Sequence, residues 1–256
     1  MFDCQPIPRM HDSATPSRSS RDGKTLSNHI LLGLQDDDFQ TLKNFLIHHP
    51  LRRAMLLQET GQPFDFVYFI DDGLVSILAC TQGRSVEVGI VGREGLIGLP
   101  ALIGTHRSPY DVIVENEGNA YRVHVEKFRE LLSSKPSLRA CLFHYAVMQG
   151  TEAFQTAACN RLHTVEQRLA RRLLAMQKRL DHDSLQVTHD HLASLLGTDR
   201  PSVSLAARRL RLGGAIEYKH GKVRILDTER LVSIACDCAR SSETPGVAEA
   251  QMSRAS

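Results

Sequence analysis

The chain has 256 residues, of which 23% are charged and 42% hydrophobic, and its formal net charge is +2. This length allows two modest domains, each able to bury its own core. The longest apolar run, residues 96–104, contains Pro100 and is too short to span a bilayer, and no charged start leads into an apolar secretory segment. We therefore expect a cytoplasmic protein without a membrane partner.

Six cysteines are scattered along the chain without CxxC spacing, namely Cys4, Cys80, Cys141, Cys159, Cys236 and Cys238. This spacing argues against a structural zinc site and against a disulfide framework. Cys236 and Cys238 lie two residues apart on a predicted helix, so their side chains are expected to point in different directions. The twelve histidines show no metal-ligand spacing either. We predict no metal site and no cofactor, and interpret the cysteines as small, partly buried residues, with a redox role as the alternative.

The first half of the chain predicts a β-rich domain between polar tails. Residues 1–27 and 239–256 are polar and are predicted to be disordered. Residues 36–49 have a helical pattern. Between Phe64 and His124, short apolar runs separated by turn residues predict five strands, at 67–70, 74–78, 86–90, 111–114 and 120–123. Strands at this spacing indicate an antiparallel β-barrel or jelly roll.

Two helices are predicted after the strands, at residues 125–132 and 137–159. The second contains no proline and carries Leu138, Leu142 and Tyr145 at helical intervals. A long helix of this kind between two domains is typical of a dimer seam. Packing on its own barrel is the alternative.

Residues 185–226 carry the pattern of a helix-turn-helix followed by a two-stranded wing. Counted from His189, Ala193 is the fifth position, where the two helices cross closest and only a small side chain fits. Gly197 is the ninth position, where the first helix ends and glycine adopts a left-handed backbone at little cost. Thr188 and Asp199 are the predicted caps of the two helices.

The wing and the local charge point to the same partner. Residues 216–218 and 222–226, joined through 219–221, predict a hairpin with a basic tip. Residues 160–230 contain fourteen Lys and Arg against eight Asp and Glu, an excess that suits contact with phosphates. The sequence of this region therefore predicts a domain that binds duplex DNA. An ordinary pair of amphipathic helices is the alternative.

This order of elements resembles the Crp/Fnr (catabolite activator/Fnr) superfamily of transcription regulators over residues 28–238. The motifs that carry the resemblance are residues 71–73, 92–98, 107–108 and 187–227. It implies an α+β chain with a cyclic-nucleotide-binding-like sensor domain at 28–135, a dimerisation helix at 136–160 and a winged helix-turn-helix at 161–238. It also implies a homodimer on a palindromic operator, with half-sites about 34–36 Å apart.

The resemblance assigns roles to individual residues of the DNA-binding domain. In the recognition helix, placed from Arg200 to about Leu212, Arg200 occupies the position of an arginine that reads guanine. Pro201 and Leu205 replace a glutamate and a second base-reading arginine, so we expect an operator unlike that of the catabolite activator. Ser202 and Ser204, with their short side chains, are predicted to hydrogen-bond to base or phosphate. Phosphate contacts are predicted for Thr188, His189, Arg208, Lys219 and Lys222, and a solvated surface charge is the alternative for Arg208.

The candidate effector pocket consists of Gly98, Arg107 and Ser108. In relatives that bind cyclic nucleotides, a glycine–glutamate pair and an arginine–serine pair hold the phosphate and the ribose. Here Leu99–Pro100 stands at the glutamate position, and an unpaired buried ribose hydroxyl costs about 1–3 kcal/mol. We therefore do not expect cAMP as the effector, which stays unidentified. A salt bridge is the alternative role for Arg107, and Cys4 alone cannot hold an iron–sulfur centre.

The leading hypothesis is a dimeric, sequence-specific transcriptional regulator controlled by a signal that the sensor domain receives, with RNA polymerase as a further partner. A constitutive DNA binder whose barrel is only a dimerisation scaffold is the alternative. A small-molecule-binding protein or enzyme with an incidental basic domain is a third possibility. The sequence shows no nucleophile beside a base, no paired carboxylates and no phosphate loop, so we predict no catalytic residues.

Overall fold

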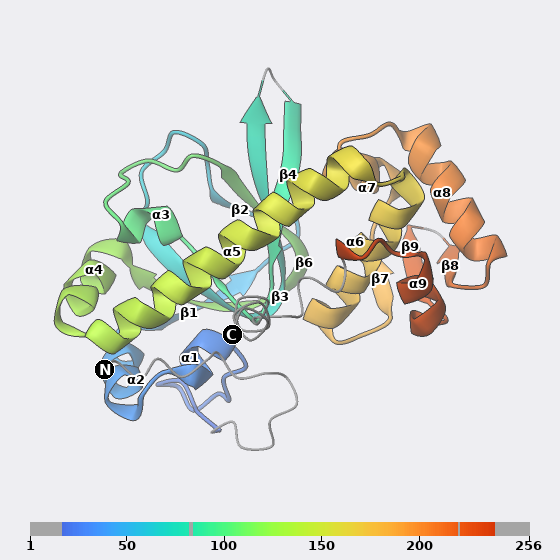
Figure 1. Ribbon diagram of the computed structural model, residues 1–256. Helices are drawn as coiled ribbons and strands as arrows, with labels where there is room; N and C mark the ends of the chain where they lie inside the picture. The colour runs from blue at the N-terminus through green and yellow to red at the C-terminus, as the bar shows by residue number, and fades with distance from the viewer. Residues whose placement is uncertain (1–16, 82–83, 220, 239–256) are drawn as a thin grey trace, which may run out of the picture. The chain divides into compact units, whose positions relative to one another are not determined.

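The computed structural model describes residues 17–81, 84–219 and 221–238 (Figure 1). The chain divides into two compact units, residues 1–151 and 152–256. The boundary falls within one long helix, α5 (Pro136–Leu162). The bounds of α5 are close to those of the predicted dimerisation helix, residues 136–160. Among the described residues, no helix is long and apolar enough to cross a membrane.

The first unit is an antiparallel sheet with helices packed against it. Its strands are β1 (Ile47–Leu51), β2 (Leu56–Gln58), β3 (Phe66–Thr81), β4 (Arg84–Val91), β5 (Leu96–Ile97) and β6 (Asp111–His124). Its short helices are α1 (His29–Gly33), α2 (Asp36–Lys43), α3 (Leu99–Leu102) and α4 (Val125–Ser134). The order β1-β6-β3-β4, with β2 paired to β6 and β5 to β3, confirms the predicted jelly-roll-like fold, although the described strands do not close into a barrel.

Strand β3 separates two cores because successive side chains on a strand point to opposite faces. Val67 and Phe69 belong to a core shared with α1, α2, α4 and the start of α5. The ring of Phe69 meets the ring of Phe128 edge to face, with centroids 5.6 Å apart. Tyr68 and Ile70 belong to the second core, which the strands form among themselves. The first core therefore fixes the start of α5 to the first unit.

Four of the five predicted strands merge in the structure into two long strands. The first two predicted runs form β3 and the last two form β6, because register shifts near Asp72 and Leu74 absorb the turn-like residues between them. Gly73 has φ +90°, and a Cβ on Gly118 would lie 2.3 Å from the Asp72 carbonyl oxygen. The predicted helix over residues 36–49 is wrong in its second half, since residues 47–51 form β1 on the edge of β6.

The predicted disordered tail ends earlier than Ser27. Arg18 is buried, and its guanidinium donates to the carbonyl oxygens of Leu31 and Leu34 at 2.8 and 2.6 Å. The same group pairs with Asp36 at 2.7 Å. These carbonyls close α1, where backbone acceptors lack helical partners, so Arg18 attaches residues 17–27 to the fold. Residues 1–16 and 239–256, the rest of the predicted tails, lie outside the described residues.

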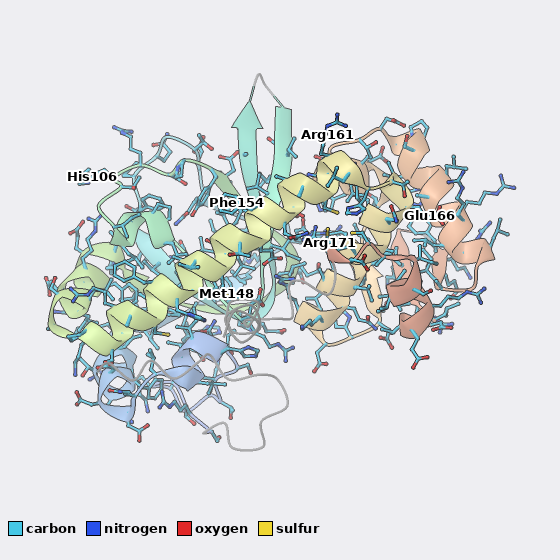
Figure 2. The ribbon with its side chains drawn as sticks, in the orientation of Figure 1. His106, Met148, Phe154, Arg161, Glu166 and Arg171 are labelled. Carbon is cyan, nitrogen blue, oxygen red and sulfur yellow. The ribbon has the colours of Figure 1, made fainter. Side chains whose placement is uncertain are left out.

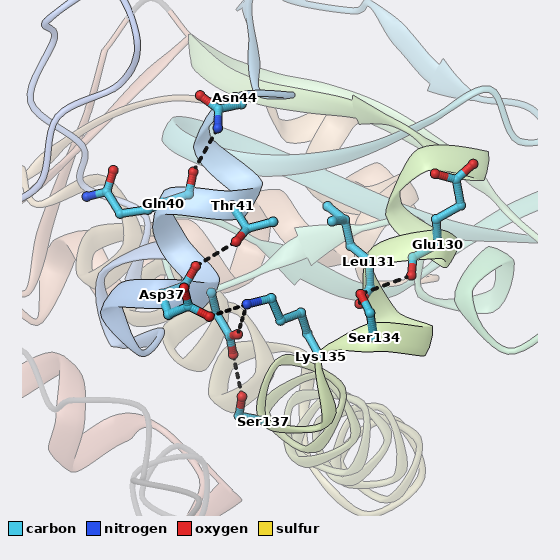
Figure 3. A network of polar contacts seen from close by, with 10 residues as sticks. Asp37, Gln40, Thr41, Asn44, Glu130, Leu131, Ser134, Lys135 and Ser137 are labelled. Carbon is cyan, nitrogen blue, oxygen red and sulfur yellow. Dashed lines mark hydrogen bonds and ion pairs between the residues drawn. The ribbon is translucent and has the colours of Figure 1, made fainter.

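A polar network links α2 to the turn between α4 and α5 (Figure 3). Lys135 pairs with Asp37 and lies 3.5 Å from Asp38, whose side chain is buried. The Ser137 hydroxyl donates to the same Asp38 carboxylate. The buried carboxylate therefore has a cationic and a hydroxyl partner, as a buried charge requires, and the network holds the first turn of α5 on the sensor unit.

The described part of the second unit contains helices and a small sheet. Its elements are α6 (Val165–Leu180), β7 (Ser184–Gln186), α7 (His189–Leu195), α8 (Arg200–Leu212), β8 (Ile216–Lys219), β9 (Lys222–Ile225) and α9 (Thr228–Ile234). Thr164 and Gln167 form a capping box at the start of α6. The sheet order is β7-β9-β8. This arrangement confirms the winged helix-turn-helix.

The prediction that Cys236 and Cys238 point in different directions is wrong. Both follow α9, which ends at Ile234, and both are buried beside Cys159 of α5. Because the chain leaves the helix before these residues, helical geometry does not separate their side chains.

Candidate nucleic-acid interface

The turn between α7 and α8 has the geometry that its residue types predict. The Thr188 hydroxyl accepts from the amide of His191, and the Asp199 carboxylate accepts from the amide of Ser202. Gly197 has φ +58° and carries the left-handed backbone between the helices. Each cap satisfies a backbone donor that the first helical turn leaves without a partner, so the direction of α8 is set locally.

Helix α8 presents a polar and basic face. Arg200, in its first turn, is exposed and pairs with Asp190 of α7 at 3.3 Å. Arg208 is also exposed, whereas Ser202 is half-buried and donates its hydroxyl to Asp199 at 2.8 Å. The exposed Leu205 adds an apolar side chain to this helix, which can contact a thymine methyl group in a major groove.

His189 connects α7, α8 and the wing. Its Nδ1 lies 3.0 Å from the Ser204 hydroxyl, so two predicted DNA-contacting residues bind each other. Its ring stacks on Tyr218 of β8 with centroids 4.1 Å apart. Burial, reinforced by the charge of Arg200, lowers the pKa of His189 below its usual value. Tyr218 is a contact that the sequence analysis missed, because nothing in its spacing relates a wing residue to α7.

The wing lies against the start of α7. The Val187 amide donates to the Gly221 carbonyl at 3.0 Å, and a Cβ on Gly221 would lie 3.6 Å from the Thr188 methyl group. Lys219 and Lys222 are exposed at the tip, opposite each other in the β8–β9 ladder. The structure thus brings Thr188 near the two wing lysines. Such proximity is needed if the three residues are to form one surface that contacts phosphates.

The candidate effector residues are not gathered around one anion. The Arg107 guanidinium is exposed and donates to the Gly61 carbonyl at 2.7 Å, while the buried Ser108 donates to the Tyr110 carbonyl at 2.6 Å. Gly98, with φ +107°, instead faces Val67 and Gln58. Arg107 and Ser108 therefore serve the local turn in this structure.

Gln58 is a candidate sensor residue that the sequence analysis missed. It is buried, and neither its amide oxygen nor its amide nitrogen has a hydrogen-bond partner in the described part of the chain. A Cβ on Gly98 would lie 3.4 Å from the amide nitrogen. An unpaired buried amide costs about 1–3 kcal/mol, so this group is suited to a ligand.

Helix α5 carries apolar residues on two faces. Leu138, Leu142 and Tyr145, which the sequence analysis named for a dimer seam, instead pack into the core of the first unit, as the alternative stated. Phe143, Val147 and Phe154 are exposed, with Val147 at 66% and Phe154, which Figure 2 labels on α5, at 78%. With Gly150 between them, their spacing of four, three and four residues matches the heptad seam of a coiled coil.

Two family models match this chain. Residues 49–135 match the cyclic nucleotide-binding domain, and residues 167–234 match the Crp-like helix-turn-helix domain. The transcriptional regulator SdrP of Thermus thermophilus is 26% identical over 180 residues, which cover 68% of this chain and 85% of that protein.

Solved structures share the fold. FixK2 from Bradyrhizobium japonicum superposes with a TM-score of 0.65 and 15% identity, over 75% of this chain and 98% of that one. The c-di-GMP-responsive global regulator CLP of Xanthomonas campestris superposes with a TM-score of 0.64 and 16% identity, over 76% of this chain and all of that one.

Proposed function

Because this chain belongs to the Crp/Fnr superfamily of transcriptional regulators, we propose that it acts as a homodimer on a two-fold symmetric operator, under a signal received by its sensor domain. The observation that carries the proposal is the exposed Arg200 in the first turn of the capped helix α8, in the same unit as a wing with exposed Lys219 and Lys222. Such a helix enters the major groove while the wing contacts phosphates.

The exposed apolar face of α5 supports the homodimer. A seam of Phe143, Val147 and Phe154 would remove large apolar side chains from water in both subunits at once. A homodimer would supply two α8 helices for two half-sites, which we expect to lie about 34–36 Å apart.

We expect Val147→Glu to convert the dimer into a monomer, because the seam would bury a carboxylate without a partner. The expected loss is about 2 kcal/mol or more of dimer stability. Sedimentation equilibrium measures it. Ile103→Glu is the matched control, since Ile103 is 71% exposed on the sensor unit, away from α5 in sequence. An unchanged dimer in Val147→Glu, or dissociation in both variants, would contradict the seam.

Selection of binding sites from random duplexes tests the function as a whole. We expect the wild-type protein at fixed salt to enrich a two-fold symmetric consensus. The selection is run in parallel with and without a small-molecule cell extract. A consensus that needs the extract supports control by an effector. The same consensus without extract supports the constitutive alternative, and failure to enrich any consensus would overturn sequence-specific binding.

For the effector, the pocket chemistry favours a ligand other than cAMP. Leu99 and Pro100, at the glutamate position, form the start of α3 and offer no side-chain acceptor for a ribose hydroxyl. The buried Gln58 amide instead offers one donor group and one acceptor to a polar ligand. This role implies RNA polymerase as a further partner. It also implies that the protein acts in the cytoplasm, where the operator lies. The role requires no catalytic activity.

A further inference from the structure

Four side chains with metal-binding atoms converge within the DNA-binding unit. Cys159 lies in the last turn of α5, His163 follows that helix, and Cys236 and Cys238 follow α9. Their ligand atoms all lie within 4.8 Å of one another. The three cysteines are buried and His163 is half-buried. All four belong to the unit of residues 152–256, so the cluster is complete without the sensor.

The separations suit one small tetrahedral ion. Bonds of about 2.3 Å to sulfur and about 2.0–2.1 Å to nitrogen place neighbouring ligand atoms about 3.5–3.8 Å apart. Here the sulfurs of Cys159 and Cys236 are 3.4 Å apart, and the Cys238 sulfur is 3.7 Å from Nδ1 of His163. An iron–sulfur cluster, whose cysteines bind different irons, needs a wider arrangement.

We propose that Cys159, His163, Cys236 and Cys238 bind one Zn²⁺ in a closed Cys₃His site. Three thiolates and an imidazole are a donor set that zinc uses in structural sites. The site would join the end of α5 to the segment after α9, residues that lie 77 positions apart between Cys159 and Cys236. It would therefore close the chain around α6 and the whole winged helix-turn-helix.

The surroundings of the cluster support a bound metal. Gln155, one helical turn before Cys159, donates from Nε2 to the Cys238 sulfur at 2.8 Å. Outer hydrogen bonds of this kind orient metal ligands and stabilise thiolate charge. Three thiolates around Zn²⁺ would carry one net negative charge, which the Gln155 amide helps to stabilise.

The redox alternative explains fewer of these contacts. A disulfide between Cys159 and Cys236 would require its sulfurs at about 2.05 Å, and it would leave the approach of Cys238 to His163 unexplained. Reactive cysteines lie in partly exposed surroundings, whereas the three cysteines of this cluster are buried.

The test uses the full-length chain, reduced, stripped with a chelator and kept anaerobic. Zn²⁺ is titrated against a chromophoric chelator, and Co²⁺ serves as the spectroscopic probe. We expect one ion per chain, with the strong visible bands of tetrahedral Co²⁺ and sulfur-to-cobalt charge transfer. Bound Zn²⁺ should protect Cys159, Cys236 and Cys238 from alkylation, as read by peptide mass spectrometry, while the exposed Cys80 stays reactive.

Variants separate the cluster from the other cysteines. Cys238→Ser and His163→Ala should abolish the wild-type cobalt spectrum, and Cys80→Ser should preserve it. Gln155→Leu should keep the ligands but weaken Zn²⁺ binding about 10- to 100-fold. A wild-type chain without tetrahedral cobalt bands, or one that forms the Cys159–Cys236 disulfide in air and binds no metal after reduction, would overturn the proposal. Neither result requires a variant to fold.

Discussion

Replacing Arg200 with alanine is expected to abolish discrimination at one base pair of each operator half-site. A guanidinium fork that reads guanine contributes about 1–3 kcal/mol, or about 5- to 150-fold in affinity, over the wrong base. The loss should appear as a relaxed position in the selected consensus. Arg200→Lys should also lose discrimination, because an ammonium keeps the charge without the fork. Competition binding with single-base operator variants at fixed salt measures both effects.

Arg208→Ala is the matched control for this prediction. Arg208 lies on the same helix and is exposed, but it is predicted to contact phosphate. Its loss should weaken binding to all sequences equally and reduce the salt slope by about 1. If Arg200→Ala behaved in the same way, Arg200 would be a phosphate contact, and the assignment of base reading to α8 would need another residue.

Gly118→Ala is expected to destabilise the sensor sheet strongly. The added Cβ would lie 2.3 Å from the Asp72 carbonyl oxygen and 2.6 Å from the Gly73 amide nitrogen. Because these are backbone atoms between two register shifts of β3, they cannot rotate away. The cost should be about 3 kcal/mol, the upper end of typical overpacking penalties.

Amide hydrogen exchange resolved by peptide measures this loss where it occurs, in β3 and β6. Gly89→Ala is the control on β4, where the added Cβ would meet only the Ile77 side chain at 3.9 Å. That variant should exchange as slowly as the wild type or more slowly. Equal protection of β3 and β6 in both variants would contradict the close crossing at Gly118.

The DNA-binding helix could be predicted from the sequence because its signals are local. Asp199 and Pro201 lie beside the start of α8 at Arg200, and Gly213 directly follows its end at Leu212, so each signal is next to the boundary that it marks. The roles of Arg200 and the wing lysines rest on this geometry and stay predictions until DNA binding is measured.

The sensor domain was less predictable because its decisive contacts are distant in sequence. The residues at 71–73 have the composition of a turn, yet pairing with β6 carries β3 through them with a bulge. The polar segment around Arg18 looks unfolded until the carbonyls of Leu31 and Leu34 offer the guanidinium buried acceptors. The unpaired amide of Gln58 becomes visible only when burial is known.

Sequence by itself determined the class of this protein, since periodicity, caps and basic charge act over a single turn or hairpin. Tertiary structure alone decided which distant groups meet. Cys159 and His163 are a helical turn apart, and Cys236 and Cys238 flank a single residue, but each pair supplies only two of the four ligands that a closed zinc site needs. Packing of α6 and α9 brings both pairs to one point. Bringing such distant residues together costs conformational entropy, which burial of the unit's core offsets. No local sequence pattern encodes this closure.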